Sequence, residues 1–473
     1  MMLTMHLLIP VLFSAVASFP RIIDYYDRGH KSEAAPTNLS QDDALFLTPY
    51  IENGQIEKAQ KLATVPPLLK NVHSYSGFLT VNKTANSNIF FWLFKSQQGN
   101  WEDKPLVVWL QGGPGGSSMF GLLVEIGPFF VATGLKVKRR KYPWNRKFNL
   151  VVIDNPVGTG FSFTESDAAY PNNEIEVARD LYCALVQLFK LFPNLQKNKL
   201  FVTGESYAGK YIPAIGYKIY RENKVSDFKI RVGGLMLGNA WTDPINQISY
   251  GAYAYKLGLV DQQTKSRMEE KEQFARALLR AGKWREADHT SDEALNEFLR
   301  ASGVDLYDFV NDDVFKGMED TRTFMEREET RKAIHVGNLT FNDGYSSAWH
   351  LSDDVMQSVR PWVEELLQAE EFPILFYSGQ LDVIVAYPLS LGFYDSLEWS
   401  HAYDYYKADR CKFLVGDDVA GYYKTAGTFT EVMVRNTGHM VPTTQPKWAY
   451  GLLERFITDV DSFKKCRDGA KGL

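Results

Sequence analysis

The segment Lys199-Leu-Phe-Val-Thr-Gly-Glu-Ser-Tyr-Ala-Gly209 decides the fold and the search for a catalytic site. Its apolar first half is typical of a buried strand, and its second half is a turn of small residues with Ser206 at the apex. This is the layout of a nucleophile elbow, in which a sharp strand-to-helix turn lifts a hydroxyl clear of the sheet edge. Ala208 stands where the pattern G-x-S-x-G has its second glycine, so an ordinary strand that ends in a small-residue turn is the alternative.

Other parts of the chain contain similar apolar runs of strand length. They cover residues 73–81, 89–94, 106–110, 150–153, 232–237, 374–377 and 432–434. Between them lie helical patterns, the clearest at 175–192, where apolar residues keep helical spacing until Pro193. Near-continuous apolar strands that alternate with helices predict a mostly parallel central sheet flanked by helices on both faces, which is an α/β fold.

The composition changes after Pro244. Residues 261–302 are rich in Lys, Arg, Glu and Ala and carry only narrow apolar stripes, which predicts helices that sit on the sheet. Thr290 and Glu293 have the spacing of a capping box, which predicts that the second helix begins there. We therefore expect a helical cap insertion over the active site.

The predicted organisation has five parts. They are a signal peptide (1–17), an N-terminal arm or pro-segment (18–65), a first core part (66–240), a helical cap insertion (241–350) and a second core part (351–473). The signal peptide is indicated by the apolar stretch from Leu7 to Val16 and the small residues that end it. No later segment approaches the ~18 apolar residues that a membrane span requires. We expect a protein of the secretory pathway, secreted or lysosomal, without a membrane partner.

Sequons and cysteines bear on the same question. The predicted glycosylation sites head Asn-X-Ser/Thr triplets and are Asn38, Asn82 and Asn338. Three cysteines allow at most one internal disulfide, for which Cys411 and Cys466 are the expected pair. Cys183 is expected to be buried on a helix as a small apolar residue.

The composition is that of a globular protein with a large core. Of 473 residues 45% are apolar, and the net charge of -5 gives no general attraction to nucleic acid. The basic cluster at 136–147 is interrupted by apolar residues, and we interpret it as a solvated loop. No metal and no cofactor is predicted.

A serine hydroxyl is a weak nucleophile, so it needs a base and a third group that orients the base. In an elbow-bearing sheet the chain order is serine, acid, histidine. His439 follows the last predicted strand in a loop of small residues, although a histidine in a loop is often only a surface residue. Asp382 follows the strand at 374–377 and is the candidate acid. Asp154 also ends a strand but precedes the serine, which favours a structural role.

A glycine-rich loop at 111–118 follows the strand at 106–110. Its consecutive glycines can point backbone N–H groups at a developing oxyanion. A phosphate cradle is the rival interpretation of such a loop. It fails here because no lysine and helix start follow at the spacing of a P-loop.

Five segments together resemble the serine carboxypeptidase family, and its vitellogenic carboxypeptidase-like branch in particular. They come in the family's order between residues 70 and 460 and are Gln111-Gly-Gly-Pro-Gly-Gly-Ser-Ser118, Ile153-Asp-Asn-Pro-Val-Gly-Thr-Gly-Phe-Ser162, Gly204-Glu-Ser-Tyr-Ala-Gly209, Ser378-Gly-Gln-Leu-Asp382 and Gly438-His-Met-Val-Pro442. The resemblance implies an α/β-hydrolase fold and a serine-type carboxypeptidase that removes the C-terminal residue from peptides and proteins.

The resemblance also implies a role for each matching residue. Ser206 would be the nucleophile, His439 the general base and acid, and Asp382 the group that orients the imidazolium. The backbone N–H groups of Gly113 and Tyr207 would hold the oxyanion. The residues implied for binding the substrate's free carboxylate are Gln111, Gly112, Glu125 and Glu205, while Met440 and Tyr207 would line the side-chain pocket.

Two neighbouring glutamates agree with that implication on physical grounds. Two close carboxyls cannot both ionise cheaply, so in mild acid they keep a proton and can donate a hydrogen bond to an incoming carboxylate. Above neutrality they would repel it. We therefore expect an activity optimum in mild acid, while a solvated turn residue is the plain alternative for Glu205.

The chain departs from the family pattern in two places. Many members have asparagine at the position of Gln111 and cysteine at that of Gly116, so the fit of the carboxylate and the family's disulfides differ here. An esterase or acyltransferase that uses the same triad is one alternative function, and a non-catalytic binding protein is another. The sequence leaves open whether the chain forms a homodimer.

Overall fold

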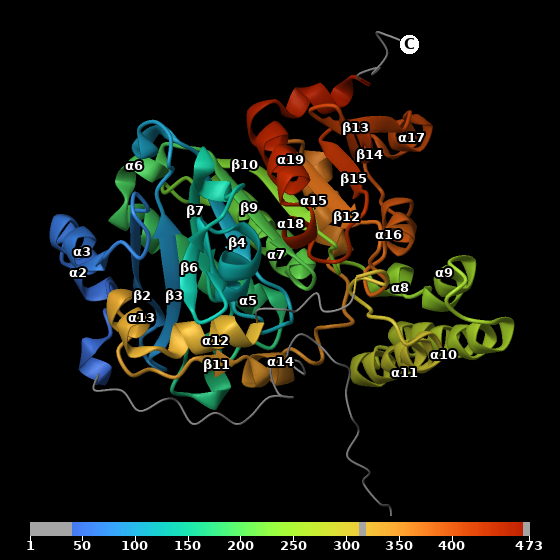
Figure 1. The fold of residues 1–473 in the computed structure, drawn as a ribbon, viewed down its shortest axis with the longest axis horizontal. Coiled ribbons are helices and arrows are strands. Elements are labelled where there is room, and N and C mark those ends of the chain that lie inside the picture. The colour runs from blue at the N-terminus through green and yellow to red at the C-terminus, as the bar shows by residue number, and fades with distance from the viewer. Residues whose placement is uncertain (1–39, 312–317, 467–473) are drawn as a thin grey trace, which may run out of the picture.

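The computed structural model describes residues 40–311 and 318–466. Within them, eleven strands form one sheet in the order β1-β2-β3-β7-β4-β9-β10-β12-β15-β14-β13 (Figure 1). The strands are β1 (Thr64–Val65), β2 (Ser74–Asn82), β3 (Ser87–Phe94), β4 (Leu106–Leu110), β7 (Asn149–Ile153), β9 (Leu200–Glu205), β10 (Val232–Gly238), β12 (Ile374–Gly379), β13 (Cys411–Val415), β14 (Asp418–Ala426) and β15 (Phe429–Val434). The central strands from β7 to β15 run parallel, and the strands at both edges are antiparallel. Each strand predicted from the sequence is therefore confirmed.

Helices cover both faces of this sheet, because the central strands are buried on both sides. In β4, for example, Val108 packs into the core on one face while Val107 and Trp109 pack into the core on the other. The first face is covered by α2 (Thr48–Glu52), α3 (Ile56–Ala63), α5 (Glu174–Leu191), α7 (Ala208–Val225), α15 (Arg360–Ala369), α16 (Tyr387–Tyr394) and α17 (Ala402–Lys407). The second is covered by a π-helical turn (Gly121–Ile126), α12 (Met318–Glu326), α18 (Val441–Thr444) and α19 (Pro446–Thr458).

Shorter elements lie between these helices and strands. They are α4 (Ser118–Phe120), α6 (Pro193–Gln196), α13 (Glu328–Ala333) and α14 (Tyr345–His350), with the strand pairs β5 (Phe129–Ala132) with β6 (Lys136–Arg139) and β8 (Thr159–Gly160) with β11 (Asn342–Asp343).

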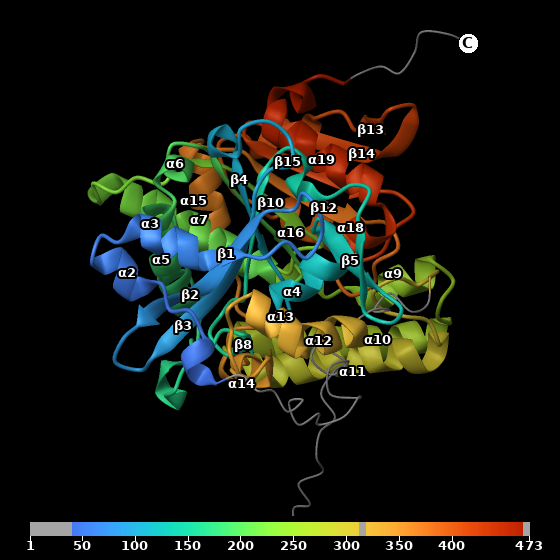
Figure 2. The same cartoon turned by 60° about the vertical axis from the view of Figure 1, so that its left-hand side comes forward.

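Four helices follow β10: α8 (Pro244–Gln247), α9 (Tyr250–Lys256), α10 (Gln262–Arg280) and α11 (Trp284–Ser302). Figures 1 and 2 place the long α10–α11 pair on one side of the molecule, beyond the ends of the strands. The predicted capping box is wrong, because α11 begins six residues before Thr290, whose hydroxyl donates to the Glu286 carbonyl one turn earlier. Residues 284–302 form one continuous helix, which the charged composition of this segment did not indicate.

The ends of the described chain are tied to the sheet. Residues 48–65, which the sequence suggested as part of an irregular arm, form α2, α3 and β1, and β1 pairs with β2. Cys411 at the opposite edge forms the expected disulfide with Cys466. Cys183 lies on α5 as a free thiol and is only partly buried. The predicted signal peptide and Asn38 lie outside the described residues.

No helix in the described ranges is both long and apolar enough to cross a membrane.

Candidate active site

The elbow at Ser206 is built by close backbone packing. Ser206 joins β9 to α7 with φ +62°, in the left-handed region that is unfavourable for a residue other than glycine. Its N–H donates to the Gly238 carbonyl at 2.9 Å, and its own carbonyl accepts from Trp241 N–H at 3.0 Å. A Cβ atom on Gly204 would come within 2.2 Å of the Leu110 carbonyl oxygen. The small residues of the motif are thus required to hold a strained, half-buried serine at the strand end.

Four adjacent parallel strands bring the candidate catalytic groups to one edge. The order β9-β10-β12-β15 places the carboxyl ends of these strands side by side. Ser206 follows β9, Asn239 follows β10, Asp382 follows β12 and His439 follows β15. Ligands of parallel α/β sheets bind at this edge. Sheet topology therefore gathers residues that lie more than 200 positions apart.

Asp382 and His439 form a fully buried pair. The Asp382 carboxylate lies 2.8 Å from His439 Nδ1, and both side chains have no exposed surface. Asn239 Nδ2 donates to the same carboxylate oxygen at 2.6 Å, and Val385 N–H donates to the other at 3.2 Å. His439 Nε2 has no hydrogen-bond partner within the described residues, so Ser206 and His439 are not hydrogen-bonded to each other here.

Asn239 was missed by the sequence analysis. Its side chain also accepts the Gly379 N–H at 3.2 Å, so it joins the ends of β10 and β12 around Asp382. The available signal was its position two residues after the strand predicted at 232–237.

Asp154 has the structural surroundings that the sequence favoured. Its carboxylate accepts from Ser117 Oγ at 2.6 Å, from Ser118 N–H at 3.0 Å and from Phe161 N–H at 2.9 Å. Burial raises the pKa of Asp154 to about 7, although these hydrogen bonds act in the opposite direction. Asp154 thus fixes the end of the glycine-rich loop.

The glycine-rich loop packs directly against the elbow. A Cβ atom on Gly112 would lie 2.6 Å from both the Ser206 Cβ and the Tyr207 nitrogen. Gly113, with φ +120°, lines one pocket together with Ser206 and Tyr207. The two residues whose backbone N–H groups are expected to hold an oxyanion therefore line the same pocket as the serine.

A second buried group contains the residues expected to bind a carboxylate. The Gln111 amide nitrogen donates to Glu205 at 2.7 Å and to Glu125 at 3.3 Å, and its oxygen accepts from Trp109 Nε1 at 2.9 Å. Burial raises the pKa of Glu125 to about 7. Burial, followed by repulsion from Glu125, raises the pKa of Glu205 well above its ordinary value. The glutamates thus form a neutral or singly charged pair in mild acid.

Glu125 sits in the π-helical turn, and Arg140 braces that turn. The Arg140 guanidinium donates to three carbonyls, those of Leu123 at 2.7 Å, Val124 at 3.0 Å and Gly127 at 3.0 Å. Its positive charge also lowers the pKa of Glu125 slightly against the effect of burial. The interpretation of residues 136–147 as a solvated loop is thus wrong: Lys136–Arg139 form the strand β6, Arg140 is partly buried against these carbonyls, and Trp144 and Asn145 are buried. The residues that Arg140 contacts lie outside the cluster and gave no sequence signal.

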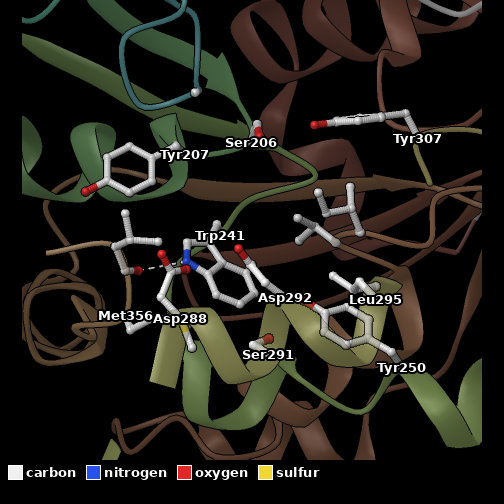
Figure 3. Close-up of a pocket in the computed structure, with 14 residues that line it drawn as sticks. Ser206, Tyr207, Trp241, Tyr250, Asp288, Ser291, Asp292, Leu295, Tyr307 and Met356 are labelled. Carbon is white, nitrogen blue, oxygen red and sulfur yellow. Dashed lines mark hydrogen bonds between the residues drawn. The ribbon is translucent and has the colours of Figure 1, made fainter. Parts of the chain in front are cut away.

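The pocket beside Ser206 has walls from both the core and the insertion (Figure 3). Its lining residues are Gly113, Ser206, Tyr207, Trp241, Tyr250, Asp288, Ser291, Asp292, Leu295, Tyr307, Val355, Met356, Ile384 and Val385. Figure 3 shows Asp288, Ser291 and Asp292 of α11 gathered around Trp241, below Ser206 in this view, with Leu295 next to Tyr250. Tyr307 also contacts the His439 ring edge-on, with 5.0 Å between ring centroids.

Some expected residues lie elsewhere. Gln111, Glu125 and Glu205 do not line this pocket, and the expected wall residue Met440 is buried outside it. Of the two described sequons, Asn338 is exposed, whereas Asn82 is partly buried and its side-chain oxygen accepts from Thr84 N–H at 3.1 Å. Glycosylation at these sites stays a prediction.

Comparisons with known proteins agree with the geometry. The solved structure of Kex1(delta)p, a prohormone-processing carboxypeptidase from Saccharomyces cerevisiae, has a TM-score of 0.74 and 23% identity, and the match covers 90% of this chain and 97% of that one. This likeness confirms the α/β-hydrolase fold.

Sequence comparisons extend the match to a family of exopeptidases. Venom serine carboxypeptidase from Apis mellifera is 45% identical over 433 residues, which cover 88% of this chain and 92% of the relative. Vitellogenic carboxypeptidase from Aedes aegypti is 40% identical over 475 residues, which cover 96% and 99% respectively. The profile of the peptidase S10 serine carboxypeptidases matches residues 66–459. This chain therefore belongs to the serine carboxypeptidase family.

Proposed function

We propose that this protein is a serine-type carboxypeptidase that removes the C-terminal residue from peptides and proteins through an acyl-enzyme. The observation that carries the proposal is the buried Asp382–His439 pair at the same sheet edge as Ser206 on its strained elbow. A nucleophile, a base and a group that orients the base are the parts that acyl transfer needs.

In the proposed mechanism, Ser206 Oγ attacks the carbonyl carbon of the last peptide bond while His439 Nε2 takes the hydroxyl proton. Asp382 holds the imidazole through Nδ1 at 2.8 Å and stabilises its positive charge. The Gly113 and Tyr207 N–H groups stabilise the negative oxygen of the tetrahedral intermediate. His439 then protonates the leaving amine, the terminal amino acid departs, and water hydrolyses the ester on Ser206 by the reverse proton transfers.

The Gln111, Glu125 and Glu205 set is proposed to receive the substrate's free carboxylate, next to Gly112. Their hydrogen-bonded and protonated state in mild acid supports this role, since a protonated carboxyl can donate where a carboxylate would repel. Because this set does not line the pocket beside Ser206, the pocket is assigned to the side chain that precedes the cleaved bond.

The test is release of amino acids from blocked dipeptides between pH 4.5 and 7.5. The controls are the Ser206→Ala protein and the same peptides with amidated C-termini. Release that requires both Ser206 and a free carboxylate supports the proposal. Ester hydrolysis without peptide cleavage would instead favour an esterase or acyltransferase, and inactivity towards both substrates would favour a binding protein.

We also propose that the protein acts in the secretory pathway, as a secreted or lysosomal enzyme. The relative from Apis mellifera is a venom serine carboxypeptidase, which supports this location. The test is whether the expressed protein leaves the cell or fractionates with lysosomes, and whether glycosidase treatment lowers its mass. Its mass in solution will tell whether it forms a homodimer.

A further inference from the structure

A buried ion pair lies directly behind the pocket beside Ser206. The Lys210 side chain has no exposed surface, and its ammonium group donates to both the carboxylate and the backbone carbonyl of Asp354. The Tyr207 hydroxyl donates to the same carboxylate at 2.8 Å. The Asp354 carboxylate thus accepts hydrogen bonds from Lys210, in the first turn of α7, and from Tyr207, the residue before that helix.

The ion pair connects two walls of the pocket. Tyr207 follows the nucleophile and lines the pocket from the elbow. Val355 and Met356, which follow Asp354 in the chain, line it from another side. Trp241 Nε1 donates to the Val355 carbonyl at 2.9 Å, the bond drawn as a dashed line in Figure 3. Residues more than 140 positions apart are therefore held together by one buried lysine.

A second carboxyl faces the same lysine. Glu174, at the start of α5, is only 1% exposed. Burial, then repulsion from Asp354, raises the pKa of Glu174 well above its ordinary value, while the positive charge of Lys210 acts to lower it. Neither oxygen of the Glu174 carboxyl has a hydrogen-bond partner within the described residues. Tyr211, one turn after Tyr207 on α7, also faces Glu174. One cation serves two carboxyls, so the cluster is electrically balanced when Glu174 holds its proton.

We propose that Lys210 is a positioning residue that sets the shape of the pocket. By holding Asp354 it fixes Tyr207 and the Val355–Met356 wall relative to Ser206. The inference rests on the proposed function, since it concerns the substrate side chain that precedes the cleaved bond. A large side chain depends on both walls, whereas a small one reaches neither.

The experiment compares Lys210→Met with Lys218→Met on the same helix. Lys218 is about a third exposed and pairs with Glu222, at 2.7 Å, so it is a control for the loss of a helical lysine. The substrates are blocked Phe-Leu and Ala-Leu. For Lys210→Met we expect a roughly 10-fold fall in kcat/KM for Phe-Leu and about 2-fold for Ala-Leu, because small displacements of positioning groups are costly. Equal losses for both substrates, or none, would overturn the proposal.

Two further variants keep the test decisive if Lys210→Met fails to fold. Asp354→Asn preserves the shape of the side chain and should give the same selective loss. Glu174→Gln keeps the shape of a neutral Glu174 and leaves the Lys210–Asp354 pair in place, so its Phe-to-Ala preference at pH 5 should equal that of the parent. A selective loss of Phe-Leu cleavage in Glu174→Gln would contradict the inference.

The failure of the proposed function would be seen separately. If the parent protein releases no amino acid from either dipeptide, the matching N-blocked phenylalanine and alanine esters report the same selectivity without a carboxypeptidase step.

Discussion

Asp382 and Glu205 are both fully buried carboxyls, but they differ in the groups that surround them. Asp382 accepts hydrogen bonds from Asn239 and a backbone N–H and lies against the His439 ring, all of which stabilise a negative charge. Glu205 is equally buried but meets a second carboxyl, Glu125, and shares one amide with it. Burial alone therefore does not decide what an acid does. The partners decide whether hydrogen bonds hold the carboxylate, as they do for Asp382, or whether a second carboxyl adds to the effect of burial and raises the pKa, as for Glu205.

The largest effect on catalysis should come from replacing Asp382, the carboxylate that accepts hydrogen bonds from Asn239 and Val385. Asp382→Asn keeps the shape but cannot stabilise the imidazolium or impose the correct tautomer on His439. We expect kcat to fall by about 10⁴-fold with little change in KM. Steady-state kinetics on a blocked dipeptide measure both quantities.

Glu431→Gln is the matched control for a lost buried acid. Glu431 has no exposed surface and lies on β15, the strand that leads to His439, where it contacts the Tyr387 hydroxyl at 3.2 Å. Its activity should stay within about 2-fold of the parent. If Asp382→Asn and Glu431→Gln lose activity equally, Asp382 has no role beyond that of any buried acid.

The Glu125–Glu205 pair should make substrate binding depend on pH. The pKa of Glu125 is raised to about 7, so the pair keeps its protons below that pH and loses one above it. KM for peptides should be nearly constant at pH 5 to 6 and rise by up to about 10-fold per pH unit above 7. Glu125→Gln should raise KM at pH 5 by roughly 10-fold and flatten its pH dependence.

Esters without a free carboxylate are the control for this pH effect. Their KM should not follow the pair's titration. A peptide KM that stays flat from pH 5 to 8 in the parent would refute the proposed carboxylate receptor.

A smaller effect should follow from loosening the turn that carries Glu125. Arg140→Met removes three hydrogen bonds to the carbonyls around that residue and one nearby positive charge. We expect KM to rise about 5-fold, with the KM–pH curve moved to higher pH because the Glu125 carboxyl loses a stabilising cation. Arg139→Met is the control, since Arg139 is exposed and donates to the Lys70 carbonyl instead. A similar KM for Arg140→Met and Arg139→Met would argue against a role of Arg140 in holding the turn that carries Glu125.

The smallest effect concerns stability in the insertion. Glu272 on α10 accepts the Gly251 N–H at 2.7 Å, and burial raises its pKa to about 7. Its folded pKa exceeds the unfolded one, so its contribution to stability is complete below about pH 4 and is lost as pH rises towards 7. Glu272→Gln should therefore unfold about 2 °C above the parent at pH 7.5 and at the same temperature at pH 5.

Glu269→Gln, on the same helix, is the comparison for thermal unfolding. Glu269 is about a third exposed and pairs with Lys265 at 3.5 Å, so its replacement should not produce the same difference between pH 5 and pH 7.5. A pH-independent shift in Glu272→Gln would disprove the linkage.

The sequence predicted the central strands and the candidate triad because these depend on local patterns. A buried parallel strand is a continuous apolar run, and Ser206, Asp382 and His439 each follow one. The glutamate pair was reached through the family resemblance rather than from the residues, since nothing local distinguishes Glu205 from a solvated turn residue.

The sequence analysis missed features that depend on contacts between distant segments. Arg140 reads as one of several basic residues until its three carbonyl partners are known. Lys210 gives no sign that it meets Asp354 144 positions later. Thr290 misled because a capping pattern can occur inside a helix when the residues before it are also helix formers.

One helix, α11, supplies Asp288, Ser291, Asp292 and Leu295 to the pocket, whereas the proposed nucleophile, acid and base all follow strands of the sheet. Substitutions on a single face of α11 can therefore change which substrate side chain is preferred, while the proposed catalytic residues stay the same. For the engineer, these four positions define a compact library in which substrate preference can be selected with little risk to turnover.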